Sequence, residues 1–248
     1  MNAARMAELL SRFTTDTPPS TQMLGHLQLY LDLLLRWNAR TNLTAIRTPE
    51  EIVTRHFGES LFAARMLLPK SRREPSLVPE AKASSNSYGP PVRGPEGPLY
   101  PVTTLADVGS GAGFPGIPMK LFAPELALTL IESHNKKATF LREVIRALQL
   151  DRAEVFSGRA ERWGKTADLV TLRAVEQYER VLPAAASLVA PNGRLCLLVG
   201  AGQVPTAHET LGASWMWQEP IAVPQSSGRV VLVGMMNRLY SSLPEADR

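Results

Sequence analysis

The chain has 248 residues, of which 44% are hydrophobic, and this size predicts one substantial core with a small accessory part rather than two equal domains. Its formal net charge is +4, from 21 arginines and 6 lysines against 23 acidic residues, which favours a nucleic-acid partner but fits a merely solvated basic surface equally well. No membrane-length apolar run and no signal-like apolar core occurs, so we expect no membrane contact and a cytoplasmic location.

The amino-terminal part predicts two helices. Leucines recur at helical spacing over residues 21–38, with polar residues between them, as in an amphipathic helix. A second helix should begin at Thr48, where Glu51 completes a capping box and Pro49 suits the first turn, and should run to about Leu68. Residues 1–68 are therefore expected to form a helical extension.

The composition changes over residues 69–102. Eight of the chain's 20 prolines fall between Pro69 and Pro101, with several glycines and serines and almost no apolar periodicity. This stretch predicts a linker or insertion.

Residues 103–248 alternate between strand-like and helix-like segments, which implies an α/β domain with a largely parallel sheet and helices on both faces. A carboxyl-terminal antiparallel hairpin is predicted where residues 215–223 and 230–235 flank Pro-Gln-Ser-Ser-Gly. The single cysteine, Cys196, lies in an apolar run that predicts a buried strand. Because the chain has only this one cysteine, an internal disulfide is excluded. One cysteine and four scattered histidines give no metal-ligand spacing, so no metal is predicted. The expected strands are residues 104–108, 126–132, 153–156, 168–172 and 194–199. The expected helices are one ending near residue 124, then residues 135–148 and 181–188.

The most informative segment follows the first of these strands and reads Asp-Val-Gly-Ser-Gly-Ala-Gly-Phe from Asp107 to Phe114. Gly109, Gly111 and Gly113 permit backbone conformations and close approach that a Cβ atom would obstruct, so an adenosine-type ligand could lie against the turn. Glycines alone are weak evidence, because a tight turn needs them too.

Two acidic residues sharpen the interpretation. Glu132 ends the next predicted strand, about 20 residues after the loop, where a carboxylate can accept hydrogen bonds from both ribose hydroxyls. The same residue would serve NAD, so a dehydrogenase is the natural competitor. Asp107 would repel a pyrophosphate but could help to hold the methionine ammonium group or its ordered water, which favours S-adenosyl-L-methionine and a methyltransferase.

Several segments resemble the RsmG (formerly GidB) family of methyltransferases, which make 7-methylguanosine in 16S ribosomal RNA. The resemblance covers nearly the whole chain except the proline-rich stretch and the tail, and it implies a Rossmann-like class I methyltransferase sheet with an amino-terminal helical extension. The matching segments are Trp37-Asn38, Asn42-Leu43-Thr44, Arg55-His56, the run from Asp107 to Pro118, Lys136-Lys137, Phe140-Leu141-Arg142, Arg159-Ala160-Glu161 and Arg173-Ala174.

The resemblance implies that the cofactor lies against Gly109 and Phe114, with Ala160 and Glu161 at the adenine and Arg173 nearby. Taken singly, Phe114 could be a core residue and Arg173 a surface cation. We expect no catalytic base, because guanine N7 already has an exposed lone pair and its methylation needs no deprotonation. The predicted cofactor site is Asp107, Gly109, Gly111, Gly113, Phe114, Glu132, Ala160, Glu161 and Arg173.

The RNA is expected to enter a cleft at the carboxyl ends of the strands, with the target base splayed out of a single-stranded loop. The residues predicted to edge this cleft are Asn42, Arg55, His56, Lys136, Arg159 and Arg173. Simpler roles stay open at three of them: Asn42 could cap a turn, His56 could be a packing residue, and Lys136 could lie on a solvated helix face.

The expected partner is small-subunit ribosomal RNA or the 30S particle, and the expected state is a monomer. Two other functions remain: a methyltransferase of a small molecule or protein, whose activity would not depend on RNA, and a non-catalytic RNA-binding assembly factor, which would bind RNA without turnover. An NAD-dependent oxidoreductase is a more distant alternative, separable by asking which cofactor raises thermal stability.

Overall fold

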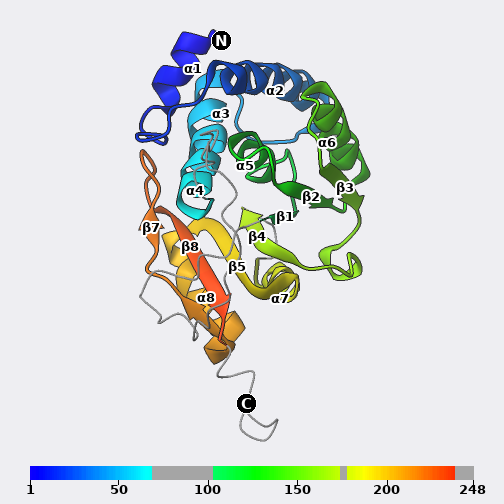
Figure 1. The fold of residues 1–248 in the computed structure, drawn as a ribbon, viewed down its shortest axis with the longest axis vertical. Helices are drawn as coiled ribbons and strands as arrows, with labels where there is room; N and C mark the ends of the chain where they lie inside the picture. Colours follow the sequence, from blue (N-terminus) through cyan, green and yellow to red (C-terminus); the bar gives the residue numbers. More distant parts are fainter. Residues whose placement is uncertain (69–102, 174–177, 238–248) are drawn as a thin grey trace, which may run out of the picture.

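The computed structural model describes residues 1–68, 103–173 and 178–237. The predicted linker or insertion at 69–102 and Ala174 lie outside the described residues. Within them, the chain forms a central sheet covered by helices on both faces (Figure 1). No helix in this described part is long and apolar enough to cross a membrane.

The sheet contains eight strands in the order β3-β2-β1-β4-β5-β8-β6, with β7 also paired to β8. The first five strands are parallel, whereas β8 runs antiparallel to β5, β6 and β7. The order therefore reverses next to β1, and a doubly wound sheet opens a crevice at such a point, outside the carboxyl ends of its strands. The strands are β1 (Thr104–Val108), β2 (Ala127–Glu132), β3 (Ala153–Ser157), β4 (Ala167–Arg173), β5 (Val189–Gly200), β6 (Trp215–Trp217), β7 (Ile221–Ala222) and β8 (Arg229–Met236).

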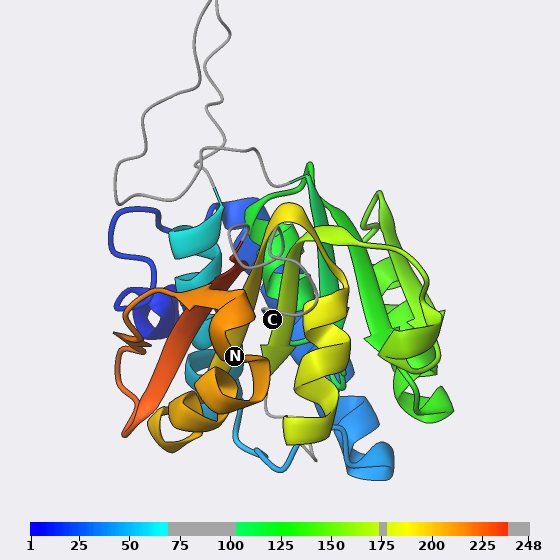
Figure 2. The same ribbon diagram turned by 90° about the horizontal axis from the view of Figure 1, so that it is seen from below.

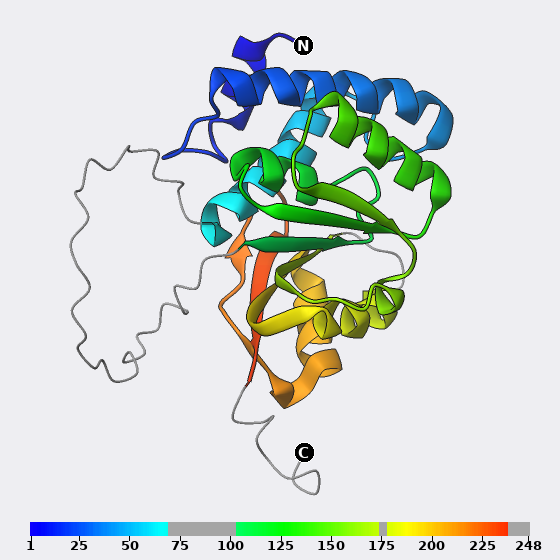
Figure 3. The ribbon, with the colours of Figure 1, turned by 45° about the vertical axis from the view of Figure 1, so that its right-hand side comes forward.

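Alternate side chains of the strands enter two different cores. Leu105 of β1 joins the core beneath the amino-terminal helices, whereas its neighbour Ala106 joins the core beneath α7 (Tyr178–Ser187) and α8 (Val204–Leu211). Figure 3 shows the resulting layers, with α2 (Thr21–Thr41) and α6 (Asn135–Ala147) on one side of the sheet and α7 and α8 on the other. Figure 2 shows α7 and α8 in front of the strands that they cover.

The helices of the amino-terminal part share the first core with the sheet, so they form one packed body with it. Leu24, Leu27, Leu31 and Leu34 of α2 are buried, as the leucine spacing predicts. The helices on this side are α1 (Ala3–Leu10), α2 (Thr21–Thr41), α3 (Pro49–Ile52), α4 (Glu59–Leu67), α5 (Gly116–Phe122) and α6 (Asn135–Ala147); those on the other side are α7 (Tyr178–Ser187) and α8 (Val204–Leu211).

Two local expectations were wrong. No capping box forms at Thr48, whose side chain makes no cap hydrogen bond and instead donates to the Glu51 carboxylate over 2.7 Å. A π-helix, Val53–Gly58, interrupts the second predicted helix between α3 and α4. The hairpin is antiparallel as expected, but its first arm is divided into β6 and β7, which both pair with β8.

Candidate functional site

The glycine loop connects β1 to α5 and is pinned to the end of β2. The backbone N–H groups of Gly109 and Ser110 donate to the Ile131 carbonyl over 2.9 and 3.1 Å. The three loop glycines have positive φ, namely 66° at Gly109, 56° at Gly111 and 90° at Gly113. A side chain would be strained in this region, so the loop needs glycine for its path.

Glu132 ends β2 beside this loop. One of its carboxylate oxygens accepts from the Gly111 N–H over 2.9 Å, and the other accepts from the His134 N–H over 2.7 Å. Each carboxylate oxygen has two acceptor sites, so both retain one for a further donor. Glu132 also lines the cleft, which makes it a suitable acceptor for paired hydroxyl groups.

Asp107 lies beneath the loop and not at its surface. Its side chain is fully buried, with one carboxylate oxygen accepting from the Thr171 hydroxyl over 2.7 Å and the other from the Gly116 N–H over 3.2 Å. Burial raises the pKa of Asp107 to about 6, although these hydrogen bonds oppose the shift. Asp107 therefore joins β1, β4 and the start of α5, and an effect on a bound ligand would pass through the loop that it holds.

A cleft of about 700 Å³ opens above the glycine loop. It brings together residues from the loop, from the ends of β2 and β4, from the segment after β3 and from the amino-terminal helical part. Of the predicted residues, it is lined by Asn42, His56, Gly109, Gly111, Phe114, Glu132, Arg159, Ala160, Glu161 and Arg173.

Four predicted residues are not among the lining residues: Asp107, Gly113, Arg55 and Lys136. Gly113 faces the helical layer, since a Cβ atom there would lie 2.6 Å from the Tyr30 hydroxyl oxygen. Lys137, the neighbour of Lys136, lines the cleft instead. Thr44 also lines the cleft, and no role was predicted for it, although it lies within the Asn-Leu-Thr segment that carried the resemblance.

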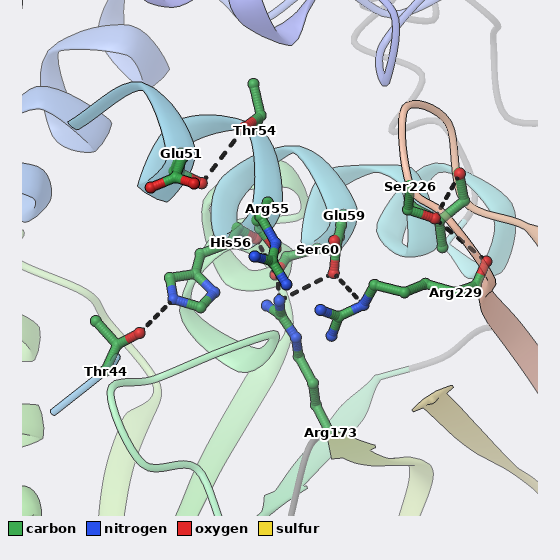
Figure 4. Close-up of polar contacts among 11 residues, drawn as sticks. Thr44, Glu51, Thr54, Arg55, His56, Glu59, Ser60, Arg173, Ser226 and Arg229 are labelled. Atoms are coloured by element: carbon green, nitrogen blue, oxygen red, sulfur yellow. Dashed lines mark hydrogen bonds and ion pairs between the residues drawn. The ribbon is translucent and has the colours of Figure 1, made fainter. Parts of the chain in front are cut away.

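Asn38 holds the Asn42–Ile46 loop at the cleft. Its amide donates to the carbonyls of Thr44 and Ile46 over 3.0 and 3.3 Å, and its carbonyl accepts from the Thr44 N–H over 3.0 Å. The Thr44 hydroxyl in turn hydrogen-bonds to Nε2 of His56 at 2.8 Å (Figure 4). This chain of contacts fixes the His56 ring.

Phe114 lies at the centre of an aromatic and cationic group. The His56 ring stacks on it with centroids 4.5 Å apart, and the guanidinium carbon of Arg173 lies 5.9 Å from the centroid of the Phe114 ring. Burial, with Arg173, Arg229 and Arg55 nearby, holds the pKa of His56 well below its usual value, so His56 is neutral at pH 7. Nδ1 of His56 and Nη1 of Arg173 are both buried without a hydrogen-bond partner among the described residues.

Such unpartnered polar atoms are costly unless a ligand or water satisfies them, and both belong to residues that line the cleft. They supply one arginine donor and one imidazole nitrogen at the end of the cleft formed by β4 and the helical layer. Among the described residues, no group of three or more His, Cys, Asp or Glu side chains could hold a metal ion.

The family model described as "GidB: rRNA small subunit methyltransferase G" matches residues 23–74 and 99–219. The chain belongs to this family. Ribosomal RNA small subunit methyltransferase G of Xanthomonas euvesicatoria is 35% identical over 211 residues, covering 82% of each chain. The protein of the same name from Xylella fastidiosa is 34% identical over 216 residues, covering 84% of each chain.

Membership of the GidB family makes the chain a methyltransferase, in agreement with the prediction from the glycine loop and Glu132. A solved structure of a mutant of MtNAS shares the fold, with a TM-score of 0.52 and 14% identity over 94% of this chain and 77% of that chain. The fold class is thus confirmed: a Rossmann-like methyltransferase sheet with an antiparallel end and a helical amino-terminal part.

Proposed function

We propose that this GidB-family chain transfers a methyl group from S-adenosyl-L-methionine to N7 of a guanine in 16S ribosomal RNA. The observation that carries the proposal is the cleft itself, which joins Glu132 and the open glycine loop to a rim containing Arg159 and Lys137. A carboxylate beside a glycine turn suits an adenosine moiety, and cationic side chains at the rim suit RNA phosphates. The described residues thus fit both substrates of the reaction.

S-adenosyl-L-methionine supplies an activated methyl group when bound. Glu132 is proposed to accept from the ribose hydroxyls, Gly109 and Gly111 to allow close approach of the ligand, and Ala160 and Glu161 to border the adenine. Gly111 has no atom within 4 Å of an added Cβ other than the Gly109 carbonyl oxygen at 3.7 Å, so its outer side is open.

The reaction requires no general base, because guanine N7 is already a nucleophile and carries no proton that must be removed. Orientation of the base is the main contribution, and it can be worth up to about 7–11 kcal/mol in favourable cases. Phe114 and the neutral His56 stack on each other and both line the cleft, so they form a rigid aromatic wall beside which an extruded base could be ordered. The guanidinium group of Arg173 lies beside the Phe114 ring and could donate a hydrogen bond to an acceptor on the ligand without transferring a proton.

For the RNA contacts, we propose Asn42, His56 and Arg159, together with Lys137 in the position first assigned to Lys136. We also propose that the protein acts as a monomer in the cytoplasm on 16S ribosomal RNA or on the 30S particle. The matched GidB-family relatives carry the name of a small-subunit methyltransferase, which supports this substrate class.

The decisive test is transfer of tritium from labelled S-adenosyl-L-methionine to purified 16S ribosomal RNA and to 30S particles, followed by nucleoside analysis. Labelled 7-methylguanosine is expected, with 23S ribosomal RNA as the unlabelled control. Cofactor binding by calorimetry without label in either small-subunit substrate would contradict the RNA part of the proposal. Label in another nucleoside would contradict the assignment to N7.

A further inference from the structure

A buried ion-pair group lies behind the cleft and joins three distant parts of the chain. One oxygen of the Glu59 carboxylate accepts from Nη2 of Arg173 over 2.9 Å, and the same oxygen forms an ion pair with Nε of Arg229 at 3.3 Å. Glu59 begins α4, Arg173 ends β4 and Arg229 begins β8 (Figure 4). The side chains of Glu59 and Arg173 are only 3% and 4% exposed, so water cannot replace their contact easily.

The two terminal nitrogens of Arg173 are used very differently. Nη2 donates to the Glu59 carboxylate and to the Arg55 backbone carbonyl, both on the helical segment that carries the cleft residue His56. Nη1 is buried and has no hydrogen-bond partner among the residues that the structure describes. The guanidinium group is planar and rigid, so fixing Nη2 also fixes the direction in which the Nη1 hydrogens point.

The charge balance gives Glu59 its importance. Among the residues that the structure describes, it is the one carboxylate that pairs with Arg173 and Arg229, and without its charge these two cations would lie close together in a poorly solvated place. Burial lowers the pKa of Arg173 to about 10, which leaves it protonated at pH 7. Arg173 is thus a permanent donor, and the Glu59 carboxylate is the charged one of the two acceptors that hold its Nη2.

We infer that Glu59 is a positioning residue that aims Nη1 of Arg173 at a hydrogen-bond acceptor of the ligand bound in the cleft. Glu59 is not among the residues that line the cleft, whereas Arg173 is. The inference rests on the proposed function for its activity readout, but not for its affinity readout. It gives the amino-terminal helical part a role in orienting a group carried by the sheet.

The test is a double-mutant cycle with wild type, Glu59→Gln, Arg173→Lys and the double variant. Arg173→Lys keeps the charge but removes the planar fork, so it shows which parameter depends on Arg173: kcat, KM for RNA, or Kd for S-adenosyl-L-methionine. Glu59→Gln should change that same parameter in the same direction, by about tenfold or more, and should add almost nothing in the Arg173→Lys background. Losses that simply multiply would overturn the inference, as would an unchanged Glu59→Gln enzyme.

Because Glu59→Gln could fail to fold, Glu59→Asp provides the second route, since it keeps the charge on a shorter side chain. Glu59→Asp should recover most of the parameter that depends on Arg173, which a purely structural role at this site would not require. Asp16→Asn is the matched control, because it removes an ion pair with Arg65 in the same helical layer, away from the cleft. The control should leave kcat, KM and Kd at their wild-type values, and an Asp16→Asn loss equal to that of the Glu59 variants would overturn the inference.

Calorimetry on the same four proteins separates this inference from the proposed function. If wild type methylates no RNA, the proposed function fails, yet the cycle can still be read in the affinity for S-adenosyl-L-methionine. If wild type is active and the cycle is additive in every parameter, the inference fails while the proposed function stands.

Discussion

Asp107 should make the stability of the protein depend on pH in a predictable direction. Burial raises its pKa in the folded state to about 6, against an ordinary value of 3.8. A raised pKa stabilises the folded state fully below the unfolded-state value, and this contribution is lost as the pH rises through 6. Asn cannot titrate, yet its side chain can accept from the Gly116 N–H and donate to the Thr171 hydroxyl.

We therefore expect Asp107→Asn to gain stability relative to wild type as the pH rises. The difference in the free energy of unfolding should grow by about 2 kcal/mol between pH 4 and pH 7. Urea unfolding followed by circular dichroism at several pH values measures it. A difference that does not vary with pH would show that Asp107 titrates normally.

Two glycines of the same loop should respond differently to replacement by alanine. At Gly113 the added Cβ would lie 2.5 Å from Ile117 Cδ1 and 2.6 Å from the Tyr30 hydroxyl oxygen, so Gly113→Ala should lower the free energy of unfolding by about 2 kcal/mol or more. At Gly111 there is space, and the cost of the positive φ alone is about 1 kcal/mol.

Gly111→Ala should instead weaken the binding of S-adenosyl-L-methionine, because Gly111 lines the cleft and Gly113 does not. Calorimetry and urea unfolding on both variants would show the two effects separately. Equal losses of stability, with no difference in affinity, would count against the assignment of Gly111 to the cofactor site.

Single residues were predicted well where their chemistry alone decides their place. Glu132 was expected at a strand end beside the loop and lies there. Arg55 and His56 could not be separated, because neighbouring residues on a helix point about 100° apart and only packing decides which one faces the cleft. The same rotation distinguishes Lys137 from Lys136.

At the scale of elements, α2 reaches the glycine loop through Tyr30. The Tyr30 hydroxyl donates to the Ala112 carbonyl, and its ring stacks on Phe114 with centroids 5.4 Å apart. This contact joins the amino-terminal helices directly to the predicted cofactor site. Removing only the hydroxyl should free the loop while leaving the aromatic packing in place.

We expect Tyr30→Phe to lower the free energy of unfolding by about 1 kcal/mol and to lower the affinity for S-adenosyl-L-methionine several-fold. Tyr178→Phe is the control, because the Tyr178 hydroxyl is buried without a partner in the described part of the chain. Thermal unfolding and calorimetry on the two variants provide the comparison. Equal effects of both substitutions would mean that the hydrogen bond to the loop is unimportant.

The elements themselves were largely predictable, since their signals are local. Leucine spacing gave α2, and alternating apolar segments gave β1, β2, β4 and β5. The π-helix was not predictable, because its extra residue per turn depends on tertiary packing, such as that of Phe57 against Tyr30 and Phe114, and leaves no mark in the spacing. Helices α1 and α8 are eight residues each and were missed, because so short a segment shows little periodicity.

For the molecule as a whole, the proposed RNA cleft implies a dependence of binding on salt. If Arg159 and Lys137 each neutralise a phosphate, alanine at either position should reduce the slope of log affinity against log salt by about 1. Arg12→Ala is the control, because Arg12 is exposed but does not line the cleft. Filter binding of 16S ribosomal RNA between low and physiological salt measures the slopes, and unchanged slopes for both cleft variants would place the RNA elsewhere.

The overall sheet order and the cleft were partly predictable, since a glycine turn after the first strand of such a domain normally marks a ligand site. Contacts between distant segments were not. The buried ion-pair group is the example: Arg173 and Arg229 both pair with the carboxylate of Glu59, which is far from them in the sequence. Nothing in the sequence around these residues indicates that they meet. Tertiary packing alone brings them together.

The place of β8 has a consequence for how the protein is made. β8 is the last described strand in the sequence, yet it lies inside the sheet, between β5 on one side and β6 and β7 on the other. A nascent chain therefore cannot pair the edge of β5 until residues 229–236 have left the ribosome, and an unpaired apolar edge invites aggregation. Translation that stops shortly before Arg229 should yield an insoluble product. A stop codon that removes only β8 and the residues after it should therefore be enough to prevent soluble protein from forming.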